Sequence, residues 1–212
     1  MKIWGAKARG NPLRVAIFLA EKGIEVPFEP VDLMHGAHRD AGFLAKNPVG
    51  LVPVLELDDG TCISETVAIC RYFERLHPEP PLMGAGALDE ALVEMWQRRV
   101  EFHVYGAARE VLRHSVPFAK ALEPVQLAEW ADLNRPRLSR GLSMLEDRLR
   151  TAPFIAGDRF TVADITAIFA VQMLDHIQAP IPQGHTALQR WRAEVFARPS
   201  VKSVIESPKT AG

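Results

Sequence analysis

The hydrophobic and polar positions of the first 80 residues follow two periods in turn. Short apolar runs predict strands, whereas apolar residues that recur every three or four positions predict helices with one buried face. Between two apolar runs, the dipeptide Asp59-Gly60 indicates a tight hairpin turn. The expected elements are a strand, a helix, a strand, a short helix, a two-stranded hairpin and a helix, over residues 1–5, 12–22, 26–33, 39–47, 52–64 and 65–76. This βαβαββα order is typical of a thioredoxin-like domain.

The pattern changes after residue 87, where almost no strand signal remains. Apolar residues at helical spacing predict helices over 88–114, 124–150, 161–176 and 186–196, with a last turn near 200–205. Ahead of them, the segment HPEPPLMGAGA contains three prolines and two glycines, which break regular structure. The chain is therefore predicted to have a thioredoxin-like domain at 1–80, a linker at 81–87 and an all-helical bundle domain at 88–212.

One predicted helix start carries a complete capping signal. In DRFTVADI, Thr161 fits the N-cap and Asp164 the third helical position, with Phe160 and Ile165 at the hydrophobic staple positions. Such a cap stabilises a protein by about 1 kcal/mol. We expect a role in stability at this position and no chemistry.

Composition narrows the class of protein. With 212 residues, 48% of them hydrophobic, the chain can bury a large core, and a formal net charge of −1 argues against a nucleic-acid partner. No secretory leader pattern opens the sequence and no apolar run is long enough to span a bilayer, so we expect a cytoplasmic protein without a membrane partner. Cys62 and Cys70 have the spacing of neither a redox CxxC pair nor a zinc site. We therefore expect buried thiols in a reducing compartment, and no metal.

Candidate binding chemistry lies in NPVGLVPVLELDDGTCISETVAI, residues 47–69. Pro53 stands at the first position of a predicted strand, where its missing N–H costs no ladder bond. If the Val52-Pro53 bond is cis, the N–H and C=O of Val52 can pair with an extended ligand in place of the sheet. The sequence thus predicts a peptide-binding backbone at Val52.

A second candidate lies where SET ends the hairpin and opens the next helix. The first amides of a helix have no partner inside it and carry partial positive charge, so Thr66 and these amides form an anion site. Glu65 beside them can bind a cation, and the two together suit the head group of an α-amino acid. The alternative is that Ser64, Glu65 and Thr66 only cap the helix.

Together with the Pro-rich linker and GDRFTVADI, these motifs make the chain resemble a cytosolic glutathione S-transferase over essentially its whole length. The resemblance implies glutathione as co-substrate and a homodimer. It implies that the backbone of Val52, ahead of a cis Pro53, pairs with the cysteinyl unit of glutathione. It also implies that Glu65 and Thr66 hold the γ-glutamyl group, with Thr in place of the commoner Ser.

Basic side chains ahead of the second helix hold the glycyl carboxylate in this family. By resemblance these are His38 and Arg39 in HGAHRDAGFLAKN. The alternative for His38 is an ordinary solvated loop residue.

The Tyr, Ser or Cys that stabilises the glutathione thiolate in most family members is absent from WGAKARGNP. A thiolate attacks electrophiles and a thiol does not, so another donor is needed. We expect the N–H groups of Gly10 and Asn11 at the positive end of the first helix, with charge from Arg9 and Lys7. Alternatively, Asn11 only caps its helix ahead of Pro12. This absence resembles a bacterial and fungal branch of the family in which asparagine, backbone amides or a bound water act.

The helical half is expected to supply the pocket for the second substrate, with His103, Ala107 and His114 near one helix face. The resemblance implies an enzyme, a glutathione transferase that conjugates the glutathione thiolate to small hydrophobic electrophiles in detoxification. Two alternatives keep the scaffold: a glutathione-dependent peroxidase or thiol-disulfide reductase, and a non-catalytic glutathione- or ligand-binding protein.

Overall fold

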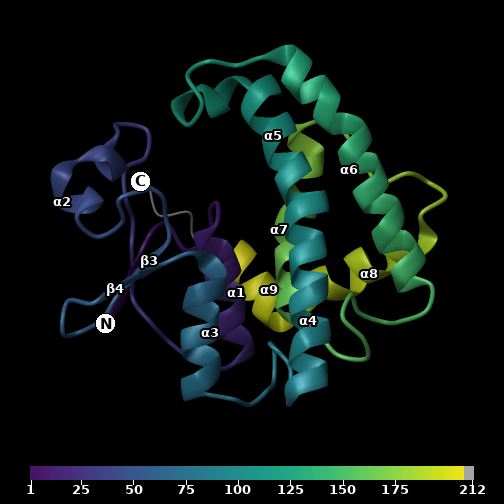
Figure 1. Cartoon of the computed structure of the whole chain (residues 1–212), viewed down its shortest axis with the longest axis horizontal. Coiled ribbons are helices and arrows are strands. Elements are labelled where there is room, and N and C mark those ends of the chain that lie inside the picture. The colour runs from purple at the N-terminus through teal and green to yellow at the C-terminus, as the bar shows by residue number, and fades with distance from the viewer. Residues whose placement is uncertain (208–212) are drawn as a thin grey trace. The chain divides into compact units, whose positions relative to one another are not determined.

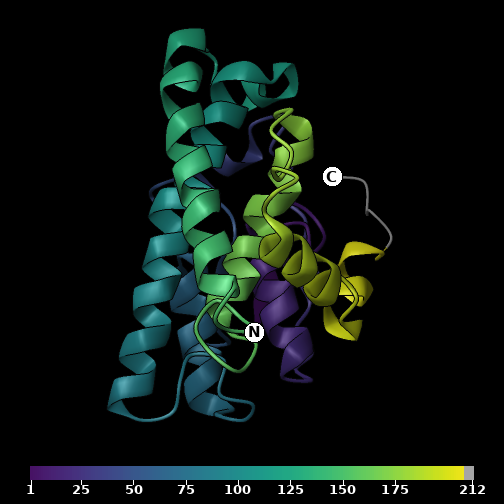
Figure 2. The ribbon, with the colours of Figure 1, turned by 90° about the vertical axis from the view of Figure 1, so that its right-hand side faces the viewer.

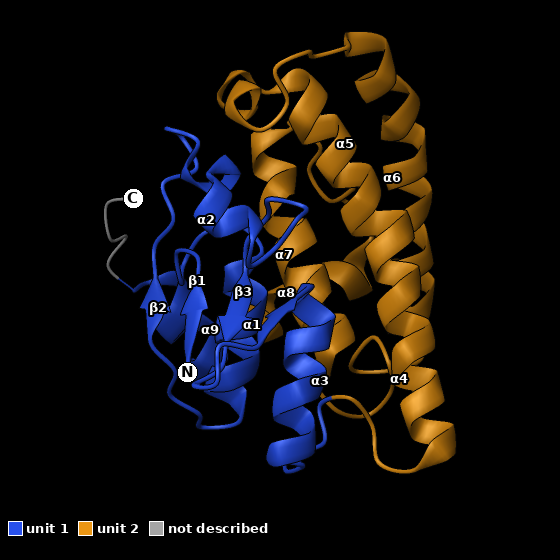
Figure 3. Ribbon diagram, turned by 60° about the vertical axis from the view of Figure 1, so that its left-hand side comes forward, with its two compact units in different colours: residues 1–82, 198–212 blue, residues 83–197 orange. Residues whose placement is uncertain are grey.

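The computed structural model describes residues 1–207, and Figure 1 labels most of their helices and strands. The chain divides into two compact units, coloured in Figure 3. Unit 1 contains Met1–Leu82 and the segment from Arg198 onward, and unit 2 contains Met83–Ala197. The last helix therefore groups with the first unit, while the predicted domain limits at 1–80 and 88–212 stay a prediction.

Unit 1 has the predicted βαβαββα order. Its elements are β1 (Lys2–Trp4), α1 (Pro12–Glu21), β2 (Phe28–Glu29), a 3-10 turn (Ala37–Arg39), α2 (Ala41–Leu44), β3 (Val54–Glu56), β4 (Cys62–Ser64), α3 (Thr66–Leu76) and α9 (Pro199–Ile205). The sheet order is β2-β1-β3-β4, with β1 parallel to β2 and the other two pairs antiparallel. Ile3 lies opposite Leu55 in this ladder, and both side chains are fully buried. The thioredoxin-like fold of this half is confirmed.

Buried charge near the end of α1 was not predicted from the sequence. The ammonium group of Lys22 donates to the carbonyl oxygens of His77 and Pro80, both at 2.7 Å, and lies 2.7 Å from a carboxylate oxygen of Glu74. The buried charge is thereby paired and hydrogen-bonded, as stability requires. These contacts fix the chain after α3 against α1.

A second polar contact holds α9 on α1. The guanidinium of Arg198 donates to both carboxylate oxygens of Glu21, at 2.7 and 2.8 Å, and Ser200 donates to the same group. Burial raises the pKa of Glu21, but these hydrogen bonds and the charge of Arg198 outweigh it and leave the pKa below its usual value. This bidentate contact explains why α9 belongs to unit 1.

Unit 2 is helical among its described residues. Its elements are α4 (Ala87–Val100), a π-helical turn (Glu101–Tyr105), α5 (Gly106–Ser115), a 3-10 turn (Pro117–Ala121), α6 (Ala128–Leu149), α7 (Val162–His176) and α8 (Thr186–Phe196). In Figure 2, α6 runs beside α5 along much of its length. The predicted helix over 88–114 is present as α4 and α5. The π turn joins them without a non-helical residue between them. At Gly141, α6 comes close to the π turn. A Cβ on Gly141 would lie 2.3 Å from the carbonyl oxygen of His103.

The start of α7 confirms the predicted capping box. One Asp164 oxygen accepts from the N–H and hydroxyl of Thr161, at 3.0 and 3.1 Å, and the other accepts from Ile155 N–H at 3.1 Å and Trp191 Nε1–H at 2.8 Å. Complete burial raises the pKa of Asp164 to about 6, against the opposing effect of these four hydrogen bonds. The carboxyl joins the start of α7 to the loop before it and to α8.

The prediction of two buried thiols is right for one of them. Cys70 is 1% exposed, and burial raises the pKa of its thiol to about 12, so it stays protonated. Cys62 on β4 is only half-buried, because it lies at the outer strand of the sheet. Among residues 1–207, no helix is long and apolar enough to cross a membrane.

Candidate functional site

The first turn of α1 and the loop before β3 meet at Gly5. Gly5 is buried with φ +133°, and a Cβ on it would lie 2.5 Å from Cγ of Pro12 and 3.3 Å from Cβ of Val52. No side chain fits at Gly5 without moving Pro12, so a hydroxyl-bearing residue is excluded at this position directly after β1. The same contacts place Pro12, the first residue of α1, and Val52 against the same glycine.

The loop that carries Val52 has the expected backbone. The Val52-Pro53 bond is cis, and the β1–β3 ladder begins at the pair of Trp4 and Val54, so Val52 lies before the ladder. Sequence analysis missed the residue that shapes this loop. Asn47 is 2% exposed; its amide donates to the Leu51 carbonyl at 2.8 Å and its side-chain oxygen accepts from Val49 N–H at 3.2 Å. An Asn-Pro pair between a helix and a glycine is a turn signal that could have identified it.

The hairpin sets the start of α3 beside this loop. Val54 pairs with Ser64, so Glu65 and Thr66 follow directly from a strand that is bonded to the strand after Val52. Glu65 is exposed and has φ +69° and ψ +119°, a region that a non-glycine residue adopts at a cost of about 1–3 kcal/mol. Thr66 is 7% exposed and is the first helical residue.

No side chain caps α3. The alternative that Ser64, Glu65 and Thr66 only cap the helix is therefore wrong. The first amides of α3 keep the unsatisfied donors and partial positive charge of an uncapped helix start. A carboxylate is the group that such a start binds best.

The two predicted basic residues differ in their surroundings. His38 lies in the 3-10 turn, is 5% exposed, and its Nδ1 has no hydrogen-bond partner. Burial, aided by the Arg39 charge and opposed by that of Asp40, lowers the pKa of His38. The lowered pKa favours the neutral imidazole, and the burial of His38 shows that the alternative of a solvated loop residue is wrong. Arg39 is exposed and carries the positive charge of this turn.

The 3-10 turn lies next to the loop of Val52. A Cβ on Gly50 would lie 3.1 Å from the carbonyl oxygen of His38. Gly50 has φ +66° and stands two positions before Val52. Four segments of unit 1 thus gather at one place: the turn before α1, the 3-10 turn, the loop before β3 and the start of α3.

The turn before α1 presents charge and an uncapped helix start. Lys7, Arg9 and Gly10 are exposed, and Gly10 has φ +61°. Asn11 occupies the N-cap and Pro12 follows at the first helical position, as predicted, but the Asn11 side chain makes no capping hydrogen bond. The alternative that Asn11 acts only as a side-chain cap is therefore wrong.

The three residues predicted to line a pocket in the helical half do not share one environment. His103 is exposed, Ala107 is 4% exposed, and His114 is half-buried. The π turn at Glu101–Tyr105 shifts the helical register between His103 and Ala107, and the role of the three residues in one pocket stays a prediction.

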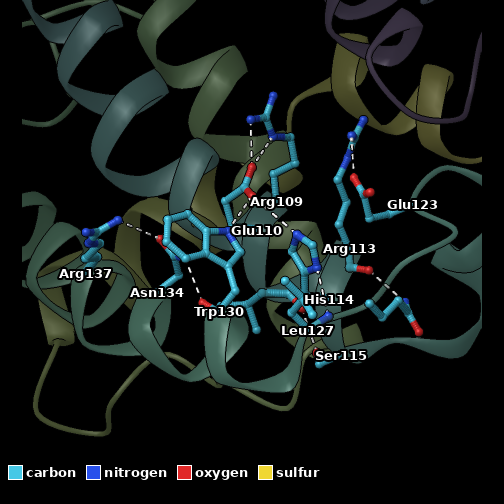
Figure 4. A network of polar contacts seen from close by, with 12 residues as sticks. Arg109, Glu110, Arg113, His114, Ser115, Glu123, Leu127, Trp130, Asn134 and Arg137 are labelled. Carbon is cyan, nitrogen blue, oxygen red and sulfur yellow. Dashed lines mark hydrogen bonds and ion pairs between the residues drawn. The ribbon is translucent and has the colours of Figure 1, made fainter.

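His114 belongs to a polar network within unit 2 (Figure 4). Its Nδ1 accepts from Leu127 N–H at 3.2 Å, and its Nε2 lies 3.8 Å from a Glu110 oxygen that also accepts from Trp130 Nε1–H at 2.9 Å. Burial raises the pKa of Glu110, but hydrogen bonds from Trp130 and Arg109 hold it below its usual value. The network ties the start of α6 to α5.

Comparison with known proteins supplies the family. Models of the glutathione S-transferase N-terminal and C-terminal domains match residues 11–76 and 111–199. Glutathione S-transferase 2 of Saccharomyces cerevisiae is 36% identical over 209 residues, which cover 97% of this chain and 90% of that protein. This chain belongs to the glutathione S-transferase family. It is a glutathione transferase, and glutathione is its co-substrate.

Solved structures of family members have the same fold. A glutathione S-transferase domain-containing protein of Marinobacter aquaeolei has a TM-score of 0.90 at 41% identity, over 95% of this chain and 100% of that one. Gtt2 from Saccharomyces cerevisiae has a TM-score of 0.91 at 36% identity, over 96% and 100%. The predicted combination of a thioredoxin-like domain and a helical domain is confirmed. Within residues 1–207, no group of three or more His, Cys, Asp or Glu side chains could hold a metal ion.

Proposed function

We propose that this glutathione transferase conjugates the glutathione thiolate to small hydrophobic electrophiles, in the branch of the family that lacks the usual Tyr, Ser or Cys. The observation that carries the proposal is the uncapped start of α3, joined through the β3–β4 ladder to the loop of Val52. A helix start of this kind, beside a strained acidic residue, suits the γ-glutamyl head group.

Each part of the tripeptide has a proposed partner. Glu65 binds the α-ammonium group, and Thr66 with the first amides of α3 binds the α-carboxylate. The backbone of Val52 pairs with the cysteinyl unit, next to Pro53. Arg39 supplies charge for the glycyl carboxylate, while neutral His38 contributes a hydrogen bond, since its lowered pKa disfavours the imidazolium.

The thiolate is stabilised by Gly10 and Asn11 at the positive end of α1, with Arg9 adding potential. The thiolate sulfur attacks the electrophilic carbon, a carbon–sulfur bond forms, and the leaving group departs with its electron pair. The thiol proton goes to solvent before attack. The positive end of α1 can stabilise the thiolate without a hydroxyl, because it lowers the energy of the anion and needs no proton of its own.

The electrophile pocket, the assembly and the location are further parts of the proposal. We assign the pocket to the helical half, with His103, Ala107 and His114 as its candidate residues. The different surroundings of the three favour the exposed His103 as the one that meets a ligand directly. The working protein is a cytoplasmic homodimer that acts in detoxification.

A panel of substrates tests the proposed reaction. We expect turnover of 1-chloro-2,4-dinitrobenzene with glutathione, at rates above those with cumene hydroperoxide or hydroxyethyl disulfide. Higher rates with either of the last two would assign the site to a peroxidase or a thiol-disulfide reductase. Tight glutathione binding with no turnover of any of the three would assign it to a non-catalytic binding protein.

A further inference from the structure

Asn47 is buried at the start of the loop before β3 and forms hydrogen bonds in both directions along the chain. Its backbone N–H donates to the Phe43 carbonyl at 3.0 Å, and its backbone carbonyl accepts from Gly50 N–H at 2.9 Å. Its side-chain oxygen accepts from Val49 N–H at 3.2 Å, and its side-chain amide donates to the Leu51 carbonyl at 2.8 Å. Asn47 therefore links the end of α2 to the rest of the loop.

These hydrogen bonds, and not the packing of the loop's own side chains, give the loop its shape. Pro48 is exposed, and Val49 and Leu51 are 63% and 42% exposed. Gly50 is buried but has no side chain to pack. Asn47, at 2% exposed, is thus the residue whose side chain is buried under this backbone.

The contact with Leu51 reaches Val52 through a single peptide unit. The carbonyl of Leu51 and the N–H of Val52 belong to one planar peptide, which is trans, because the cis bonds among residues 1–207 are Val52-Pro53 and Glu79-Pro80. In a trans peptide the C=O and the N–H point in opposite directions. The hydrogen bond that holds the Leu51 carbonyl on Asn47 therefore aims the N–H of Val52 away from Asn47.

The N–H of Val52 is a donor that the chain itself does not use. Val52 is half-buried, and its N–H makes no hydrogen bond within residues 1–207. Backbone N–H groups in folded proteins nearly always have a partner. A donor held in one direction without a partner is ready to receive an acceptor from a ligand.

The chemistry of the Asn47 contacts requires an amide. One side of the group faces an N–H and the other faces a C=O, so the two partners fix which atom is the oxygen and which is the nitrogen. A carboxylate in the same place would turn a charged oxygen towards the Leu51 carbonyl. An apolar side chain would leave the Leu51 carbonyl and the Val49 N–H without these partners.

From these contacts we infer that Asn47 is a positioning residue of the glutathione site, which sets the direction of the Val52 N–H through the Leu51–Val52 peptide plane. The Val52 N–H then donates to the carbonyl oxygen of the cysteinyl unit. The inference rests on the proposed pairing of Val52 with glutathione. Asn47 is buried and acts on the ligand through Val52.

A pair of buried asparagines tests the role of Asn47. Asn134 in unit 2 is 3% exposed, and its amide donates to the Trp130 carbonyl at 2.9 Å (Figure 4). We expect Asn47→Ala and Asn134→Ala both to lower the melting temperature, because each removes a buried hydrogen bond. Isothermal titration calorimetry should show S-hexylglutathione binding weakened about fivefold in Asn47→Ala and unchanged in Asn134→Ala. In Asn47→Ala, KM should rise for glutathione and stay at the wild-type value for 1-chloro-2,4-dinitrobenzene.

Asn47→Asp tests the donor separately and carries the test if Asn47→Ala does not fold. An ionised carboxylate keeps the acceptor for Val49 N–H but repels the Leu51 carbonyl, whereas the protonated acid can donate to that carbonyl again. We expect binding of S-hexylglutathione, which has no thiol, to be about fivefold weaker than in the wild type at about pH 8 and to approach the wild-type value at about pH 5. The Lys46–Glu56 ion pair and His38 are present in both proteins, so the ratio of the two affinities cancels their titration.

Three outcomes overturn the inference. Asn47→Ala could bind S-hexylglutathione as tightly as the wild type, Asn134→Ala could lose as much affinity as Asn47→Ala, or the affinity ratio of Asn47→Asp to wild type could stay constant with pH. A wild type that binds S-hexylglutathione but does not turn over 1-chloro-2,4-dinitrobenzene would overturn the proposed conjugation instead. The affinity comparisons would then still decide the role of Asn47.

Discussion

The starts of α3 and α7 differ in whether side chains of the same chain satisfy their first amide groups. Both helices begin with an acidic residue and a threonine close together, and every helix start has amides without partners. At α7 the carboxylate of Asp164 accepts four hydrogen bonds and is fully buried. At α3 no side chain caps the helix, and Glu65 is exposed in a strained backbone conformation.

The satisfied start of α7 contributes to stability, whereas the proposed role of the uncapped start of α3 is binding. A helix start satisfied by its own chain has nothing left to offer a ligand. An uncapped start next to the loop of Val52 keeps its donors for a carboxylate, and its strain is maintained by the surrounding structure. Under the proposed function, similar residue types have different roles, and the hydrogen-bond partners decide which one applies.

The largest effect is expected for Asp164→Ala. The change leaves the Ile155 N–H, the Trp191 Nε1–H and the Thr161 N–H without an acceptor in the interior, which lowers the free energy of unfolding by about 4 kcal/mol. Urea unfolding followed by circular dichroism measures it. Glutathione affinity of the folded fraction should stay at the wild-type value. A loss of affinity without a loss of stability would contradict the division between the two helix starts.

The pKa of Asp164 predicts an unusual pH dependence. A pKa raised from 3.8 to about 6 means that the folded protein holds this proton more tightly than the unfolded chain does. Its contribution to stability is present below about pH 4 and is lost as the pH rises through about 6, a loss of about 3 kcal/mol. Asp164→Asn cannot titrate, so the stability difference between wild type and variant should shrink from about pH 4 to about pH 7. A difference that stays constant or grows with pH would contradict the assignment.

Much of this architecture follows from the sequence because it depends on local patterns. Apolar periodicity predicted the element order, Asp59-Gly60 the hairpin, and Thr161 with Asp164 the cap, since each is encoded within a few neighbouring residues. The proposed anchors at Val52 and Thr66 came from their position relative to the predicted strand and helix ends. The structure has these ends where they were predicted, and the anchoring roles stay predictions.

What could not be predicted depends on residues far apart in sequence. The pairing of Lys22 with Glu74 and of Glu21 with Arg198 requires the tertiary arrangement. The burial that lowers the pKa of His38 also comes from packing, and the π turn before α5 carries no periodic signal that marks it. The contact that a Cβ on Gly5 would make with Pro12 also depends on the tertiary arrangement. It excludes any side chain at position 5, including one with a hydroxyl.

Glu65→Gly separates strain from binding. Glycine adopts positive φ without steric cost, so we expect the free energy of unfolding to rise by about 1 kcal/mol. Glutathione binding should weaken about tenfold, because the partner of the ammonium group is lost. Gln178→Gly is the matched control: Gln178 has φ +53° in unit 2, so its change should stabilise without altering glutathione affinity. Unchanged affinity in Glu65→Gly would remove Glu65 from the proposed site.

Thr66→Ala tests the anion end of the same site. Removal of the hydroxyl should weaken glutathione binding about fivefold, as expected for one hydrogen bond to a charged group, while Thr66→Ser restores it. Thr161→Ala is the counterpart at α7, where loss of the hydroxyl lowers stability and leaves glutathione affinity unchanged. Equal binding losses in Thr66→Ala and Thr161→Ala would show that both act through stability alone.

The smallest effect is expected at the turn before α1, where Asn11→Ala should raise the pKa of the glutathione thiol in the complex. Asn11 stands at the N-cap of α1, in the turn proposed to hold the sulfur, so we expect its loss to remove one stabilising contact from the thiolate. Ultraviolet absorbance of the bound thiolate as a function of pH measures the change. An unchanged titration in Asn11→Ala would leave the backbone amides and the positive end of α1 as the groups that hold the thiolate. The thiol activator would then be a third helix start, used through its backbone as the start of α3 is.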